Sequence, residues 1–258
     1  TQARMAVLSQ FQYRVAMYFY MIGMIAEPVI YLVVWSTIAR AQGGQVGGYT
    51  PGTFAAYYIV WTLVRNMNIV FTPYGWEWRI LHGRLSMELM RPVHPIFTDV
   101  AFFAGWKVVM ILLWLPLAAF LALVFRPEVQ PTLLESAIFF FAIWGAYLIR
   151  SMLLSLLGMI TFWTTRVSAI FELYFAVELV LSGRLVPMTL MPGWVQHLSW
   201  FLPFRWTFGF PIEALVGQLS TSELLGGLGL QLLWIGIGWA LVLLLWRTSL
   251  QRFSAVGG

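Results

Sequence analysis

Few side chains in this sequence have the chemistry that catalysis needs. Cysteine is absent, which excludes disulfides, thiolate metal sites and a cysteine nucleophile. Asp99 is the single aspartate in the chain. The three histidines lack the spacing of a metal-binding pair and stand at His82, His94 and His197. These residues leave little material for a catalytic constellation, so an enzyme is the least favoured class of function.

A second group of chemically capable residues lies inside long apolar segments. An ionisable side chain at membrane depth costs roughly 2.5–3.5 kcal/mol on insertion scales, so each one needs a partner, water or a function. Positive and negative groups occur here at comparable depth. Two interpretations stay open: ion pairs that fix helix packing, or contacts to a transported substrate. The candidates for a substrate path are Glu27, Arg65, Asn68 and Glu178. Arg150 and Glu172 are further charged residues inside the apolar segments.

The apolar segments around these groups predict an all-α, polytopic membrane protein. Of the 258 residues, 60% are hydrophobic and 10% are charged, which excludes a water-soluble globule. A helix needs about 20 apolar residues to cross a bilayer. Six segments meet that length between charges and turn signals: 17–39, 53–73, 98–125, 135–160, 168–186 and 224–246. They are expected to form a single domain, 1–258.

The distribution of arginine predicts the orientation of these spans. Most loop arginines fall on one side if the N-terminus is cytoplasmic, so the positive-inside rule places both termini in the cytoplasm. Lys107, inside the third span, is expected to extend its amine towards the cytoplasmic interface. The net charge of +5 is scattered among apolar runs and forms no nucleic-acid motif, so no nucleic-acid partner is expected.

A polar segment at 76–95, between the second and third spans, is predicted to contain one amphipathic helix over 79–91. Its apolar residues fall on one stripe, while Arg84 and Glu88 are four apart and close enough to pair. Pro92 and Pro95 end it. The helix either rests on lipid or docks a cytosolic partner. Its apolar stripe consists of Ile80, Leu81, Leu85 and Leu89.

The pattern I-x-x-G-x-L-x-x-x-L-x-x-P in this segment resembles the coupling-helix region of permeases of the type-2 exporter class of ATP-binding-cassette (ABC) transporters. Its members are Ile80, Gly83, Leu85, Leu89 and Pro92. Further stretches similar to a bacterial subfamily of these permeases are 162–166, 182–187, 191–192, 203–204 and 208–213. The resemblance implies an N-terminal interfacial helix over 1–16, an outer-leaflet re-entrant hairpin over 187–217, and the bacterial plasma membrane as the location.

The resemblance also implies separate ATPase subunits. The chain holds one lysine, Lys107, and its neighbours do not form the glycine-rich loop that binds nucleotide phosphates. ATP and Mg²⁺ would therefore be bound by two cytosolic ATPases, and a second permease, the same or a related chain, would complete the path through the lipid. The expected coupling residues are Ile80, Leu81, Gly83, Arg84, Leu85, Glu88, Leu89 and Arg166.

Two other functions remain open on the sequence. An ion-coupled secondary transporter would use Glu27 or Glu178 as a proton carrier and would need no ATPase, but it leaves the helix at 79–91 unexplained. A membrane anchor for a soluble enzyme would not need charged residues at mid-span. The ATP-driven exporter accounts for both features, so we expect that function.

Overall fold

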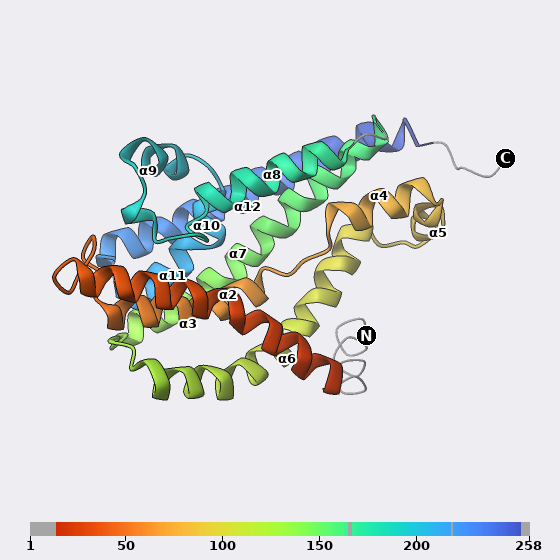
Figure 1. Cartoon of the computed structure of the whole chain (residues 1–258). Helices are drawn as coiled ribbons and strands as arrows, with labels where there is room; N and C mark the ends of the chain where they lie inside the picture. Colours follow the sequence, from red (N-terminus) through yellow and green to blue (C-terminus); the bar gives the residue numbers. More distant parts are fainter. Residues whose placement is uncertain (1–13, 165–166, 218, 254–258) are drawn as a thin grey trace.

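The computed structural model describes residues 14–164, 167–217 and 219–253, and within them it is all helical with no strand, as predicted (Figure 1). The predicted interfacial helix at 1–16 lies almost entirely outside the described residues. Among the long helices, α6 and α12 are predominantly exposed and α7 is central. The helices are α2 (Arg14–Ala41), α3 (Pro51–Met67), α4 (Pro73–Leu81), α5 (Arg84–Leu89), α6 (Pro95–Phe125), α7 (Leu133–Met159), α8 (Ser168–Leu181), α9 (Gly193–Trp200), α10 (Phe204–Thr207), α11 (Gly209–Val216) and α12 (Thr221–Leu250).

Three described helices are long and apolar enough to cross a membrane. They are α6, α7 with its 3₁₀ extension to Phe162, and α12. In each of these helices an 18-residue stretch is apolar enough to lie in a membrane. Of that stretch 56% is buried inside the protein in α7, against 17% in α6 and in α12. The apolar side chains on α6 and α12 that face outward, such as Leu123 and Leu232, are those that lipid or another chain would cover in a membrane.

Two predicted spans are shorter in the structure than in the sequence analysis. The span at 53–73 ends as a helix at Met67, where Asn68 forms the C-cap, and a non-helical stretch leads to Pro73 at the start of α4. The span at 168–186 ends at Leu181 because Gly183 takes a left-handed conformation, with φ 79°. The apolar run continues beyond the end of α3, so hydropathy did not reveal that end, whereas Ser182 and Gly183 do mark the end of α8.

The predicted single helix at 79–91 is wrong. The segment forms two helices, α4 and α5, which are separated at Gly83 by a left-handed backbone, φ 69°. A residue with a side chain is strained there, which explains the glycine. The predicted pairing of Arg84 with Glu88 is also wrong: Glu88 pairs with Arg79, 3.3 Å away, and Arg84 lies over the ring of Trp78.

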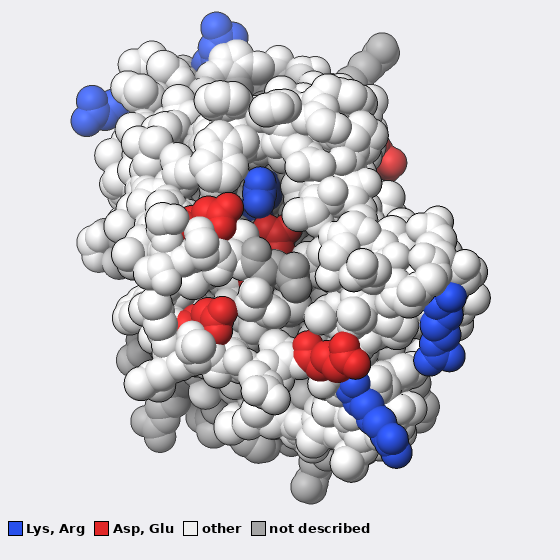
Figure 2. Space-filling model, turned by 90° about the vertical axis from the view of Figure 1, so that its left-hand side faces the viewer, with Lys and Arg blue, Asp and Glu red and all other residues white. Residues whose placement is uncertain are grey.

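The two ends of the molecule differ. Helices α4 and α5 lie with the C-terminal end of α12 at one end, and α9 lies at the opposite end (Figure 1). Viewed from the α9 end, acidic groups lie beside a basic group near the centre of the face, and other basic groups lie towards its edges (Figure 2). Glu135 and Glu223 complete capping boxes at the starts of α7 and α12.

Candidate functional site

The C-terminal end of α3 is the centre of a buried polar cluster. The last carbonyls of a helix have no partner within it and carry the negative end of the helix dipole. Lys107 of α6, fully buried, donates to the carbonyl oxygens of Asn66 and Ile69. The expectation that Lys107 extends to the cytoplasmic interface is therefore wrong, because its amine caps this helix end instead.

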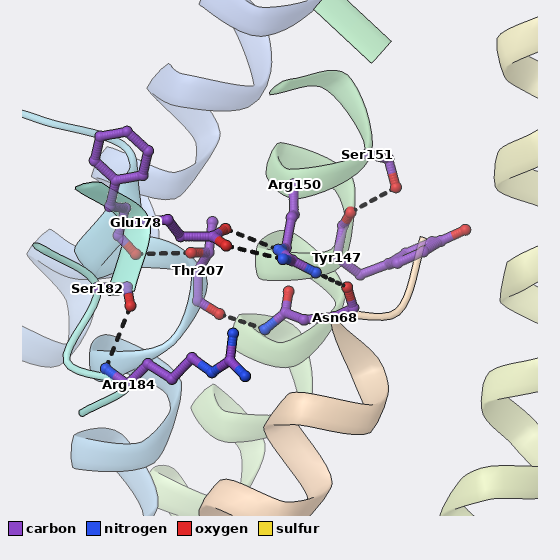
Figure 3. Close-up of polar contacts among 9 residues, drawn as sticks. Asn68, Tyr147, Arg150, Ser151, Glu178, Ser182, Arg184 and Thr207 are labelled. Atoms are coloured by element: carbon purple, nitrogen blue, oxygen red, sulfur yellow. Dashed lines mark hydrogen bonds and ion pairs between the residues drawn. The ribbon is translucent and has the colours of Figure 1, made fainter. Parts of the chain in front are cut away.

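Arg150 of α7 connects the same helix end to α8. Its guanidinium binds both carboxylate oxygens of Glu178, at 2.8 and 2.9 Å, and also donates to the carbonyl oxygen of Asn68 (Figure 3). The Glu178 side chain is only 1% exposed, so this is a buried bidentate pair. The side-chain amide of Asn68 donates to the carbonyl of Thr207 at 2.6 Å, which attaches α10 as well. The end of α3 is thus joined to α7, α8 and α10, in addition to α6.

A second cluster lies beside the first. Glu27 of α2 pairs with Arg65 of α3, as the sequence suggested, and it also lies 3.7 Å from Arg184 in the stretch after α8. All three side chains are partly accessible, with 30%, 26% and 24% of their surface exposed. One carboxylate therefore serves two arginines.

Side chains of α3 hold the backbone of residues 183–185 in place. The hydroxyl of Tyr57 donates to the Gly183 carbonyl at 2.8 Å, and the indole N–H of Trp61 donates to the Arg184 carbonyl at 2.9 Å. Tyr58 donates to the Leu185 carbonyl at 3.3 Å. These bonds satisfy irregular backbone that would be costly at membrane depth, and they fix the position from which Arg184 projects.

Helix α4 is attached to the spans through two contacts. Arg79, which is 7% exposed, forms a bidentate bond with Asp99 of α6, at 3.0 and 2.9 Å. The buried Trp76 packs on Gly158 of α7 so closely that a Cβ added there would lie 2.4 Å from the Cβ of Trp76. Any displacement of α4 is therefore passed to α6 and α7.

Burial perturbs two titratable groups near this junction. It raises the pKa of Glu88 from its usual value, and the neighbouring Arg79 only partly opposes that shift. It lowers the pKa of His94, whose Nδ1 accepts from the Ile96 amide at the start of α6 and whose ring lies 4.3 Å from that of Trp246. The neutral imidazole is the form that can cap this helix.

The expected coupling residues separate into buried and exposed ones. Ile80 and Leu85 are buried with Trp76 in a core cluster, and Leu89 packs against that cluster. Gly83 forms the turn, and Arg166 lies outside the described residues. We call four exposed apolar side chains of this segment the outer tip: Trp78 and Leu81 in α4, Met87 in α5 and Met90 directly after α5.

Several residues of these sites were not singled out from the sequence. Arg184 was counted as a loop charge, although its place beside Gly183 within an apolar segment was a signal. Arg79 and Trp76 lie in the segment assigned to coupling, but nothing local gives their partners, Asp99 and Gly158. The predicted pairing of Glu27 with Arg65 is present, whereas a role for the pair in a substrate path stays a prediction.

Comparison with known families identifies the family of the chain. Residues 25–257 match the model of a family described as ABC-2 family transporter protein. A comparison with curated proteins gave no match. The family match covers nearly the whole chain, including both polar clusters, α4 and α5. The chain therefore belongs to the ABC-2 family of transporter proteins, and it is a membrane permease of that family.

Proposed function

We propose that the chain is the transmembrane subunit of an ATP-driven exporter in a bacterial plasma membrane. Two permeases, identical or related, form the path between them, and each binds one cytosolic ATPase. ATP and Mg²⁺ bind to the ATPases. Nucleotide drives transport only if the two conformations of the complex differ in their affinity for it.

The observation that carries this proposal is the attachment of α4 and α5. Their outer tip is apolar and exposed, while their inner side is fixed to α6 by Arg79 and Asp99 and to α7 by Trp76 and Gly158. Exposed apolar side chains on helices that are firmly attached to the spans suit binding in a groove on a soluble partner. This is also the arrangement that transmits a rigid-body movement of that partner to the spans.

The proposed topology has six spans with both termini in the cytoplasm. Helices α2, α3 and α8 join the three long apolar helices as spans, and α9–α11 form the outer re-entrant hairpin. The breaks in the hairpin favour this arrangement, because Pro192, Pro203 and Pro211 disfavour one continuous spanning helix, and the segment forms three short helices instead.

The absence of cysteine allows a clean test of this topology. Single substitutions Met90→Cys, directly after α5, and Trp194→Cys in α9 place thiols at exposed positions, 80% and 68% accessible, on opposite ends. In intact cells a membrane-impermeant maleimide should label position 194 and should reach position 90 only after lysis. Labelling of position 90 from outside would refute the proposed orientation.

A second test separates docking from coupling. The paired substitutions Met87→Asp and Met90→Asp should release the ATPase that co-purifies from native membranes, because charge replaces the apolar tip. Leu133→Asp is the matched control, since Leu133 is more exposed than either methionine but lies at the start of α7. Hydrolysis and assembly that are unchanged in the paired variant would refute docking at the tip.

Gly158→Ala tests transmission itself. The added methyl displaces Trp76 and so loosens α4 from α7, while the outer tip is untouched. We expect the ATPase to bind normally, but ATP should no longer change the maleimide labelling rate at position 194. Gly229→Ala in α12 is the control, because nothing lies within 4 Å of its added methyl. The rival function, ion-coupled transport, predicts transport in liposomes without any ATPase.

A further inference from the structure

The cluster of Glu27, Arg65 and Arg184 carries an unbalanced positive charge. The charged groups that act on Arg184 are Glu27, Arg65, Arg150 and Glu178. Glu178 is already bound on both oxygens by Arg150. The remaining carboxylate, Glu27, is shared by two arginines, so the cluster keeps one net positive charge near the middle of α2. A net charge at membrane depth is costly unless a counter-ion joins it.

Arg184 is positioned to bind such a counter-ion. Its backbone is fixed by the hydrogen bonds from α3, and its guanidinium lies 6.0 Å from the ring of Trp61 and 5.8 Å from that of Phe208. Its buried Nε has no hydrogen-bond partner among the described residues. In Figure 3 the guanidinium extends from this fixed backbone towards Asn68, apart from the joined pair of Arg150 and Glu178. An arginine fixed in this way loses little entropy on binding an anion.

The surroundings of the cluster are apolar and accessible. Tyr31 and Trp61 line it with aromatic rings whose centroids are 6.4 Å apart. On α2, Ile30 and Val34 follow Glu27 on the same helical face, and they are 60% and 46% exposed. A ligand at the arginines would therefore have an apolar strip beside its charged group.

We propose that Arg65 and Arg184 bind the anionic group, a phosphate or carboxylate, of an amphiphile whose apolar part lies along α2. This inference rests on the proposed function, and it names the class of substrate: an anionic amphiphile carried between the two permeases. Glu27 tunes the site by offsetting the repulsion between the two arginines when no ligand is bound. The bidentate geometry of guanidinium suits a phosphate or carboxylate group.

The test is a binding measurement on the purified chain, which needs no ATPase. Native mass spectrometry gives the dissociation constants of phosphatidylglycerol, phosphatidylcholine and inorganic phosphate for each variant. We expect Arg184→Gln to weaken phosphatidylglycerol binding about tenfold, the loss typical of one charge-assisted hydrogen bond. Glu27→Gln should instead tighten it, because the net positive charge rises. Arg184→Lys keeps the charge but loses the bidentate geometry, so its affinity should fall between those of the unchanged chain and Arg184→Gln.

The matched control changes both Arg205→Gln and Glu213→Gln. Arg205 also lies against tryptophan rings but has a carboxylate of its own, the buried Glu213, at 3.1 Å, so removing both charges leaves no unpaired buried charge and should leave phosphatidylglycerol binding unchanged. Equal losses in Glu27→Gln and Arg184→Gln would overturn the proposal and leave a packing network only. Equal affinity for phosphatidylcholine, or for inorganic phosphate without a tail, would also overturn it. Loss of ATPase binding in the outer-tip variants is measured separately, so failure of one proposal does not imply failure of the other.

Discussion

The pair of Arg150 and Glu178 offers the sharpest test of the polar cluster at the end of α3. Arg150→Met leaves the Glu178 carboxylate, 1% exposed, without its bidentate partner and leaves the Asn68 carbonyl without a donor. Removing one partner of a buried ion pair costs about 3–5 kcal/mol. Glu178→Met should cost a similar amount, because it leaves the guanidinium charge uncompensated.

The double variant, Arg150→Met with Glu178→Met, should be more stable than either single variant. It removes both charges together, so what remains is mainly the orphaned Asn68 carbonyl, at about 1–3 kcal/mol. The single variants should lower the apparent Tm by roughly 6–20 °C, and the double variant by clearly less. Size-exclusion chromatography of detergent-solubilised protein after heating measures these shifts. A double variant whose loss equals the sum of the two single losses would refute the buried-pair reasoning.

Three further predictions concern neighbouring elements. Lys107→Met removes the donor to the Asn66 and Ile69 carbonyls, so amide hydrogen exchange should rise at the end of α3 while α12 keeps its protection. Because burial lowers the pKa of His94, its neutral form favours the folded state above about pH 6.5, and that stability should be lost as pH falls below this value. Thermal unfolding measured between about pH 8 and 5 checks this, and His94→Asn, which keeps a capping oxygen, should flatten the dependence. Gly83→Ala should cost about 1–2 kcal/mol, measured as a fall in Tm, because φ there is 69°.

The location of the helices followed from the sequence, but two of their ends were not predicted. The run Ile69–Phe71 is as apolar as the helix before it, so no local signal marks the end of α3 at Met67. That end is set by Asn68, which bonds Thr207, a residue 139 positions later in the chain. The end of α8 was missed although Gly183, in a left-handed conformation, is a local stop signal, and donors from α3 satisfy the irregular backbone that follows at 183–185.

The role of each charged residue was predictable only where its partner was also conspicuous. Glu27 and Arg65 both stood out as charges in apolar helices, and they do pair. Lys107 stood out equally, but its partners are backbone carbonyls that become available only because α3 stops there. The apolar stripe of the coupling segment misled for a similar reason. It identified Ile80 and Leu85, which face the protein's own core, and of the outer tip it identified only Leu81, not Trp78, Met87 or Met90.

The positions of these breaks connect the two proposed activities of the chain. Irregular backbone at membrane depth is tolerated only where protein or water satisfies it, and here Lys107 and Arg150 do so at the end of α3. The stretch at 68–72 that follows leads directly to α4, the helix that bears the outer tip. A movement of α4 therefore acts at the point where α3, α7 and α8 are joined, next to Arg184. We infer that the ATPase changes the affinity of the arginine site by shifting this junction, without any contact to the bound anion.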